Sequence, residues 1–288
     1  MVFILFGIIL FPFLRGLRPV KEDQPKRENQ SILQPAEVPL EKSLVNPVPV
    51  TKAENNEPVH PEKVQSMEVE TADVDLEVYF KNFNKDNSRQ SALTAVMEMW
   101  GESNSIRPYL NELADDEKFF NLAAKQNGFL IYASNTDMDL VRKLNLPAVI
   151  QLHMPEEPSF FYMAVCRIEG GEITLKQEAK EKGVGIKMGA LSPFLGGKVF
   201  IPWKNFYDYS GMISLGSATD AILTLKTHLR KIGFDELDPR PVYDKKTEEV
   251  VRHLQKKHGI REDGLVGPLT KIILYNELKS LNVPKIRD

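Results

Sequence analysis

The chain has 288 residues, 42% hydrophobic and 27% charged, which is enough apolar material for about two globular domains. The formal net charge of −3 argues against a dedicated nucleic-acid binder, so no nucleic-acid partner is expected. The single cysteine, Cys166, excludes an intrachain disulfide framework and a multi-cysteine zinc site.

Residues 1–18 are predicted to be a membrane anchor, because residues 2–14 are all apolar. This run is shorter than the roughly 20 residues that a spanning helix needs, so we interpret it as a truncated transmembrane helix. A cleaved signal peptide is not expected, since the run lacks a positively charged start and a small-residue cleavage site. The nearby Arg15, Arg18 and Lys21 oppose export of the following chain by the positive-inside rule.

Residues 19–75 are predicted to be a disordered linker rich in Pro and Glu. Eight of the nineteen prolines lie between Pro19 and Pro61, and no aromatic residue occurs between Leu17 and Val78. Such a segment cannot build a hydrophobic core, and its excess of acidic residues favours extended conformations. We expect it to hold the folded part of the protein at a distance from the membrane.

Residues 76–215 are predicted to form an α+β domain, because helical periodicity precedes β-type patterns. The expected helices cover residues 87–100, 117–128 and 138–145. A Gly170-Gly171 hairpin turn lies among the strand-like segments. The expected strands of an antiparallel sheet are residues 147–153, 160–168, 172–176, 198–203 and 211–216.

Residues 216–288 are predicted to form a small three-helix domain. Its apolar stripes occur between Ala221 and Ile232, between Val250 and Leu254, and between Leu269 and Leu278. A helix-turn-helix is an alternative, but no helix concentrates basic residues on one face. The first helix is expected to end at Gly233, the second to begin after the N-cap Asp244, and the third to begin with Gly267-Pro268.

The connection before the last helix has three tight-turn signals, at Gly259, Asp263-Gly264 and Gly267-Pro268. A plain helix hairpin needs only one glycine, so we interpret this connection as having a defined shape. It is expected to border a shallow polar groove.

The sequence lacks the common motifs of enzyme and metal sites. It contains neither a P-loop nor H-E-x-x-H, and its five histidines show no spacing typical of metal ligands. We therefore expect no cofactor and no metal. Cys166 lies within an apolar strand-like segment, which favours a buried structural cysteine over a nucleophile.

The segment GIREDGLVGPLT (residues 259–270) resembles the closing signature, D-G-x-V-G-x-x-T, of the type 1 peptidoglycan-binding family. AILTLKTHLRKIGF (221–234) resembles the family's first helix, while PVYDKKT (241–247) keeps only part of an earlier repeat. The resemblance implies peptidoglycan as a partner, although each turn glycine could simply shape the backbone. The candidate binding residues are Gln255, Arg261, Asp263, Gly264, Gly267 and Thr270.

The segment KDNSRQSALTAVMEMWG (85–101) resembles the first helix of C39 papain-like peptidases, with Ser88 in the place of the nucleophilic cysteine. In PSFFYMAVCRI (158–168), Phe161 takes the place of the catalytic histidine. A papain-like fold is implied. Activation of such a nucleophile needs a thiolate and a base in contact, so we expect no catalytic residues and no enzyme activity.

The combination of these two regions resembles the periplasmic part of the general secretion pathway protein A family (GspA/ExeA). WKNFYDYSG (203–211) is similar to a segment that follows the C39-like core of that family. The resemblance implies an inner-membrane protein with periplasmic domains that binds peptidoglycan and assists assembly of a type II secretion secretin. Because the chain lacks the family's ATPase, a separate AAA ATPase is a further expected partner. The alternatives are a peptidoglycan hydrolase or peptidase that uses the C39-like domain, and a soluble cytoplasmic regulator.

Overall fold

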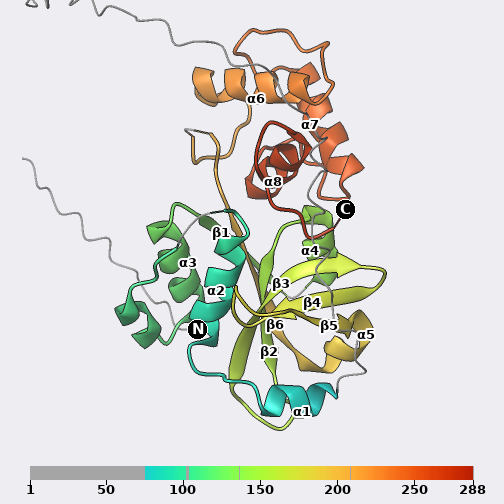
Figure 1. Cartoon of the computed structure of the whole chain (residues 1–288). Coiled ribbons are helices and arrows are strands. Elements are labelled where there is room, and N and C mark those ends of the chain that lie inside the picture. Colours follow the sequence, from blue (N-terminus) through green and yellow to red (C-terminus); the bar gives the residue numbers. More distant parts are fainter. Residues whose placement is uncertain (1–74, 102–103, 136, 208, 288) are drawn as a thin grey trace, which may run out of the picture. The chain divides into compact units, whose positions relative to one another are not determined.

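The computed structural model describes residues 75–101, 104–135, 137–207 and 209–287 (Figure 1). The predicted anchor and almost all of the predicted linker therefore lie outside the described residues. In the part that is described, no helix is both long enough and apolar enough to cross a membrane. All described residues belong to one compact unit, residues 64–288, which continues across the predicted domain boundary at residues 215–216.

The first part of this unit has α+β architecture and the last part is helical, as the sequence predicted. The helices and strands are, in chain order, α1 (Leu76–Lys81), α2 (Ser88–Glu98), α3 (Asp116–Gln126), β1 (Leu130–Asn135), α4 (Met138–Leu144), β2 (Ala148–His153), β3 (Phe160–Glu169), β4 (Glu172–Lys176), β5 (Val184–Lys187), α5 (Met188–Leu191), β6 (Leu195–Trp203), α6 (Thr219–Lys231), α7 (Lys245–Lys257) and α8 (Pro268–Glu277), with short 3-10 helices at Pro108–Glu112 and Ser192–Phe194.

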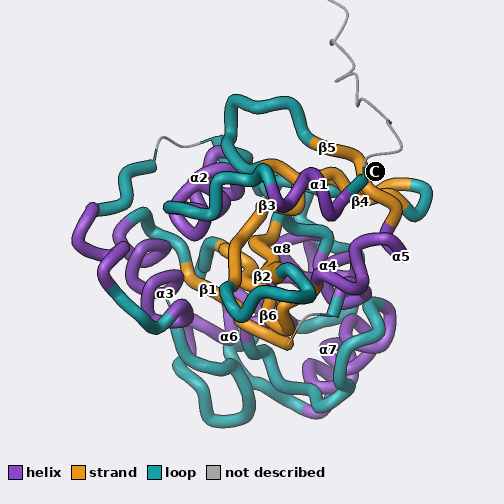
Figure 2. The backbone as a smooth tube through the Cα atoms, turned by 90° about the horizontal axis from the view of Figure 1, so that it is seen from below, coloured by secondary structure: helices purple, strands orange, loops and turns teal. Residues whose placement is uncertain are grey.

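The strands form one antiparallel sheet in the order β1-β6-β2-β3-β4-β5, and Figure 2 shows it at the centre of the surrounding helices. Consecutive residues of β3 face opposite sides of the sheet, as in any strand. Tyr162 packs on Phe120 of α3, whereas Phe161 packs on Phe80 of α1. Helices therefore cover both faces, which explains why β2 and β3 are almost entirely buried.

Two features of the sheet differ from the prediction. Residues 211–216 do not form a strand, and only Ile213 pairs with Val266 in an isolated antiparallel bridge. The Ser217 hydroxyl accepts a hydrogen bond from the Ser214 N–H and donates one to Met212 O, which curls this segment into a turn. The edge strands β1 and β5 were not predicted, because neither shows a clear alternation of buried and exposed residues.

The helix boundaries in the C-terminal part confirm the predicted capping signals. The Asp244 carboxylate accepts a hydrogen bond from the Thr247 N–H at 2.9 Å and caps α7. Gly233 and Gly259 have φ values of 105° and 62°, the left-handed conformation that ends a helix at little cost for glycine. Pro268 is the first residue of α8.

Helix α4 joins the α+β part to the C-terminal helices. Its C-cap, Asn145, has a left-handed backbone (φ 48°), and its side chain bonds both Ile286 N–H (3.1 Å) and Arg287 O (3.2 Å). The Asn276 side chain of α8 donates a hydrogen bond to Leu144 O. These bonds hold α8 against α4, so the C-terminal helices are anchored directly to the α+β part.

Candidate functional site

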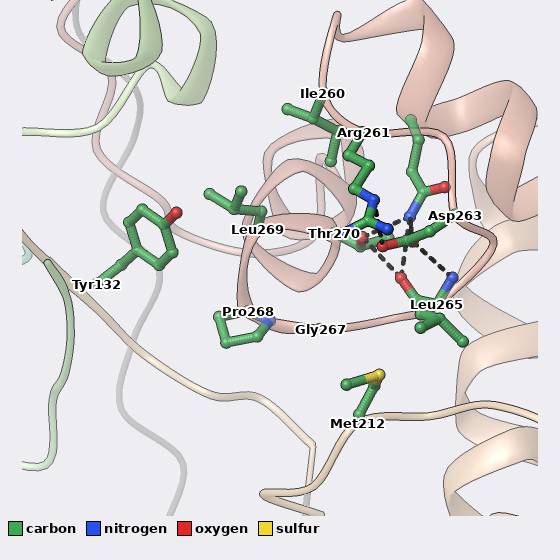
Figure 3. Close-up of a pocket in the computed structure, with 11 residues that line it drawn as sticks. Tyr132, Met212, Ile260, Arg261, Asp263, Leu265, Gly267, Pro268, Leu269 and Thr270 are labelled. Carbon is green, nitrogen blue, oxygen red and sulfur yellow. Dashed lines mark hydrogen bonds and ion pairs between the residues drawn. The ribbon is translucent and has the colours of Figure 1, made fainter. Parts of the chain in front are cut away.

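A groove of about 230 Å³ lies where the loop after α7 meets the start of α8 (Figure 3). Its walls come from four separate segments: strand β1, the turn around Met212, the end of α7 and the segment from residue 260 to residue 270. The residues that line it are Tyr132, Met212, Gln255, Ile260, Arg261, Asp263, Leu265, Gly267, Pro268, Leu269 and Thr270.

Gln255 organises the loop that borders the groove. Its side chain is almost fully buried, with 1% of the residue exposed. Its Oε1 accepts a hydrogen bond from the Gly264 N–H at 2.9 Å, and its Nε2 lies 2.9 Å from both Asp263 Oδ1 and Leu265 O. A further contact of 3.1 Å joins Nε2 to Thr270 Oγ1. These contacts occupy the amide, so Gln255 shapes the groove and has little capacity left for a ligand.

Asp263 and Thr270 complete the same network. The Asp263 carboxylate also accepts the Leu265 N–H at 2.9 Å, and Thr270 Oγ1 donates to Leu265 O at 3.0 Å. Partial burial opposes ionisation of Asp263, but the hydrogen bonds from Leu265 and Gln255 outweigh it and lower the pKa of the carboxyl. A charged acceptor is thus held inside the turn, where it fixes the loop backbone.

The two turn glycines have different roles. Gly264 has φ 71°, and a Cβ added to it would lie 2.6 Å from Glu248 Cγ, so this position requires glycine for both conformation and space. Gly264 is packed against α7 and does not line the groove. Gly267 has φ −85°, and a Cβ there would meet no described atom within 4 Å. Any residue could adopt its backbone conformation.

Arg261 is the polar lining residue that is most available to a ligand. Its side chain is 89% exposed, and its Nε lies 3.9 Å from Asp263 Oδ2, a distance that makes only a weak ion pair in water. The other accessible walls are apolar, with Met212 and Leu265 exposed and Leu269 half-buried beside Pro268. The expectation of a polar groove was therefore wrong, because the loop's polar groups are used by the loop itself.

The structure brings five of the six predicted binding residues to this groove, and Gly264 lies behind them. Tyr132 and Met212 were missed. No local sequence signal could have indicated them, since each reaches the groove through tertiary contacts with segments far along the chain. Met212 is positioned by the bridge between Ile213 and Val266, and by Lys271 Nζ, which donates to Tyr209 O and Gly211 O at 2.8 and 2.9 Å.

A second cleft, of about 350 Å³, lies at the start of α2 around Ser88. Ser88 is 3% exposed, and its Oγ accepts a hydrogen bond from the Tyr162 N–H at 3.3 Å. No histidine is among the described residues that line this cleft. The lining residues are Lys85, Asp86, Asn87, Ser88, Arg89, Asn111, Asp116, Phe160 and Tyr162.

Three of the four charged side chains that line this cleft form ion pairs. Arg89 pairs with Asp116 at 3.0 Å, and the Tyr162 hydroxyl donates to the same carboxylate. Burial, reinforced by this bond to Asp116, raises the pKa of Tyr162 and keeps the phenol protonated. Lys85 pairs with Glu157. The arrangement offers Ser88 no imidazole base among the described residues.

Phe161, which was predicted to take the place of the catalytic histidine, does not face Ser88. Phe161 is completely buried on the other side of the sheet, where its ring contacts Phe80 and Phe83. Its neighbours in β3, Phe160 and Tyr162, are the residues that line the Ser88 cleft. Because side chains alternate along a strand, a residue facing Ser88 must occupy one of these two positions.

The single cysteine and possible metal ligands are the other features to consider. Cys166 is buried, and desolvation raises the pKa of its thiol to about 11, which disfavours the nucleophilic thiolate. Among the described residues, no group of three or more His, Cys, Asp or Glu side chains is arranged to hold a metal ion.

The region around the first groove matches a known protein family. Residues 219–274 match the family model of the putative peptidoglycan binding domain. The match contains α6, α7 and the loop with Gln255, Asp263 and Gly267, so the resemblance predicted from residues 221–234 and 259–270 is confirmed. We call residues 219–274 the peptidoglycan-binding module.

Three solved structures are similar to parts of the chain. A periplasmic domain of the EpsAB fusion protein of the Vibrio vulnificus type II secretion system is 18% identical, with 69% of this chain and 82% of that chain covered and a TM-score of 0.46. The peptidase domain of Streptococcus ComA, a bifunctional ABC transporter, is 16% identical, with 43% and 95% covered and a TM-score of 0.35. The peptidase C39-like domain of a toxin secretion ATP-binding protein from Vibrio parahaemolyticus is 19% identical, with 43% and 100% covered and a TM-score of 0.35. No curated protein matches the chain in sequence.

Proposed function

We propose that this protein is a non-catalytic, membrane-tethered periplasmic protein that binds peptidoglycan and assists assembly of a type II secretion secretin. The observation that carries the proposal is the groove on the peptidoglycan-binding module, where an exposed guanidinium lies beside apolar walls. Concave, largely apolar sites with a few polar groups are typical of small-ligand recognition. Peptidoglycan combines apolar methyl groups and sugar faces with carboxylates, and this groove offers complementary groups for both.

Sedimentation of the full chain with purified sacculi tests binding. We expect the protein to pellet with sacculi, and the variant Arg261→Gln to bind about two- to fivefold more weakly, because it loses one exposed charge contact. Arg230→Gln is the matched control, since Arg230 is an exposed residue of α6 that does not line the groove. A chain that stays in the supernatant at every ionic strength would contradict the proposal.

The full chain is preferable to the isolated C-terminal region in this experiment. Asn145, Leu144 and Ile168 of the α+β part bond the C-terminal region directly, the last through its N–H to Ile286 O at 2.7 Å. Removing these partners would break the bonds that hold α8 and the C-terminal residues in place and would expose this surface to water. A loss of binding by a fragment would then have two explanations.

The proposed location rests on the apolar run in residues 2–14 and on the resemblance to the periplasmic part of the GspA/ExeA family. It requires residues 21–288 to lie outside the cytoplasm. A reporter enzyme that works only in the periplasm, fused after Asp288, should be active. Activity only of a cytoplasmic reporter at the same site would show that the orientation is wrong.

The proposed role in secretin assembly rests on the same resemblance, including the segment WKNFYDYSG (203–211). It predicts that deletion of the gene reduces the amount of assembled secretin in the outer membrane, and that the Arg261→Gln variant restores assembly less well than the Arg230→Gln variant. Normal secretin assembly in the deletion strain would contradict this part of the proposal.

A further inference from the structure

Tyr132 lines the groove although it lies outside the peptidoglycan-binding module. It belongs to β1, the edge strand of the α+β part, where it is paired with Ile201 of β6. Figure 3 shows its ring across the groove from Leu269 and Pro268 of α8. The groove is therefore shared between the module and the α+β part.

The Tyr132 side chain is available to a ligand. It is half-buried, and no hydrogen bond joins its hydroxyl to any other described residue. Its ring also forms no aromatic pair within the described part of the chain. The strand pairing with β6 fixes its backbone, so an aromatic face and a free hydroxyl are presented to the groove at a small entropic cost.

Hydrogen bonds between the α+β part and the C-terminal helices fix the wall of the groove that lies opposite Tyr132. Asn276 of α8 donates to Leu144 O at the end of α4, and Lys143 Nζ donates to Gly259 O at 3.3 Å. These contacts lie at both ends of the segment that carries Arg261 and Leu269. The distance between Tyr132 and the α8 wall is thus set by the fold and does not depend on a ligand.

The chemistry of the walls distinguishes between the two components of peptidoglycan. The glycan backbone consists of amino sugars whose N-acetyl groups and hydroxyls are uncharged. The stem peptides carry small methyl side chains and free carboxylates. An apolar groove beside an exposed guanidinium matches the second set of groups, because guanidinium binds carboxylates in a charge-assisted, bidentate manner.

We propose that Tyr132 is a ligand-binding residue and that the groove holds an acidic stem peptide between Tyr132 and the Pro268–Leu269 wall, with a carboxylate at Arg261. This inference rests on the proposed function, since it specifies the ligand of the same groove. The apolar side chains of the peptide contact Tyr132, Met212 and Leu269, and the Tyr132 hydroxyl is free to bond a peptide amide. Arg261 exchanges its weak contact with Asp263 for the ligand carboxylate.

Substitution of Tyr132 in the full chain tests this proposal. Tyr132→Thr keeps a residue suited to an edge strand and removes the ring, and Tyr132→Leu keeps apolar volume against the core if the first variant unfolds. Either should weaken binding to sacculi about three- to tenfold, the range expected for loss of one aromatic contact with a hydroxyl. Tyr109→Thr is the matched control, because Tyr109 is 54% exposed and lies outside the groove. Unfolding midpoints verify that each variant is folded.

Soluble competitors identify the ligand. A purified stem peptide with free carboxylates should displace the wild-type chain from sacculi, whereas a chitin oligosaccharide, which provides sugar alone, should not. Wild-type affinity in folded Tyr132→Thr and Tyr132→Leu variants would overturn the role of Tyr132 and leave the proposed function intact. Competition by the oligosaccharide and not by the peptide would overturn the assignment of the ligand. If the wild-type chain itself does not bind sacculi, both this inference and the proposed function fail.

Discussion

The Oε1 of Gln255 accepts a hydrogen bond from the Gly264 N–H at 2.9 Å, which ties the end of α7 to the turn before α8. The other end of the same amide contacts Asp263, Leu265 and Thr270. One buried side chain therefore defines the backbone path of the whole loop. The side chains that are free to meet a ligand, those of Arg261 and Leu265, project from this loop and make none of its hydrogen bonds.

The first prediction concerns this amide. Gln255→Ala should lower the free energy of unfolding by about 2–3 kcal/mol, because the buried Gly264 N–H loses its acceptor and the bonds to Asp263 and Leu265 are also lost. Lys256→Ala, at the exposed neighbouring position of α7, should change it by less than about 0.5 kcal/mol. Urea unfolding measures both. If Gln255→Ala loses binding with an unchanged midpoint, Gln255 contacts the ligand and our structural interpretation is wrong.

The second prediction compares two glycines that are three residues apart. Gly264→Ala should destabilise the protein by about 1–3 kcal/mol, because alanine is strained at φ 71° and its Cβ would collide with Glu248. Gly267→Ala should cost less than about 1 kcal/mol, since only a preference at the N-cap of α8 is lost. Thermal unfolding of the two variants measures the difference. Equal costs would show that the left-handed turn at Gly264 does not form in solution.

The third prediction concerns catalysis. Full-length protein should release no fragments from peptidoglycan and cleave no peptide, because Ser88 has no histidine among the described residues that line its cleft. Chromatography of digests against a boiled control measures this. The variants Ser88→Ala and Tyr162→Phe should give the same chromatograms as the wild type. Turnover that disappears in Ser88→Ala would favour the peptidase or hydrolase alternative.

The fourth prediction concerns the stability of the fold at low pH. Hydrogen bonds from the Thr247 hydroxyl and N–H, at 2.7 and 2.9 Å, lower the pKa of Asp244 in the folded protein. A carboxyl with a depressed folded-state pKa stabilises the protein above its unfolded pKa of about 4 and loses that contribution as the pH falls through the folded value. Stability should therefore decrease as the pH falls below about 4.

Asp244→Asn isolates this effect, because asparagine also caps helices but does not titrate. The variant should lose less stability than the wild type when urea midpoints at pH 7 and pH 3 are compared. Asp235→Asn is the control, since Asp235 is exposed and makes no side-chain hydrogen bond to another described residue. An acid response of Asp244→Asn as large as that of the wild type would contradict the prediction.

The sequence alone determined the features that depend on neighbouring residues. Asp244, Gly233, Gly259 and Pro268 marked the helix ends correctly, because capping and backbone strain act within one turn of the chain. The hairpin at Gly170-Gly171 was correct for the same reason, as both glycines have positive φ. Runs rich in β-branched and aromatic residues located the strands β2, β3, β4 and β6.

Only the tertiary structure decided which side chains meet. It placed Phe160 and Tyr162, and not Phe161, at the Ser88 cleft, because the strand's orientation toward α2 is set by packing on both faces. It also directed the polar groups of Gln255 and Thr270 inward and left the groove apolar. Tyr132 reaches that groove across more than a hundred residues of chain, and such a contact arises from the docking of α8 on α4, which no local pattern encodes.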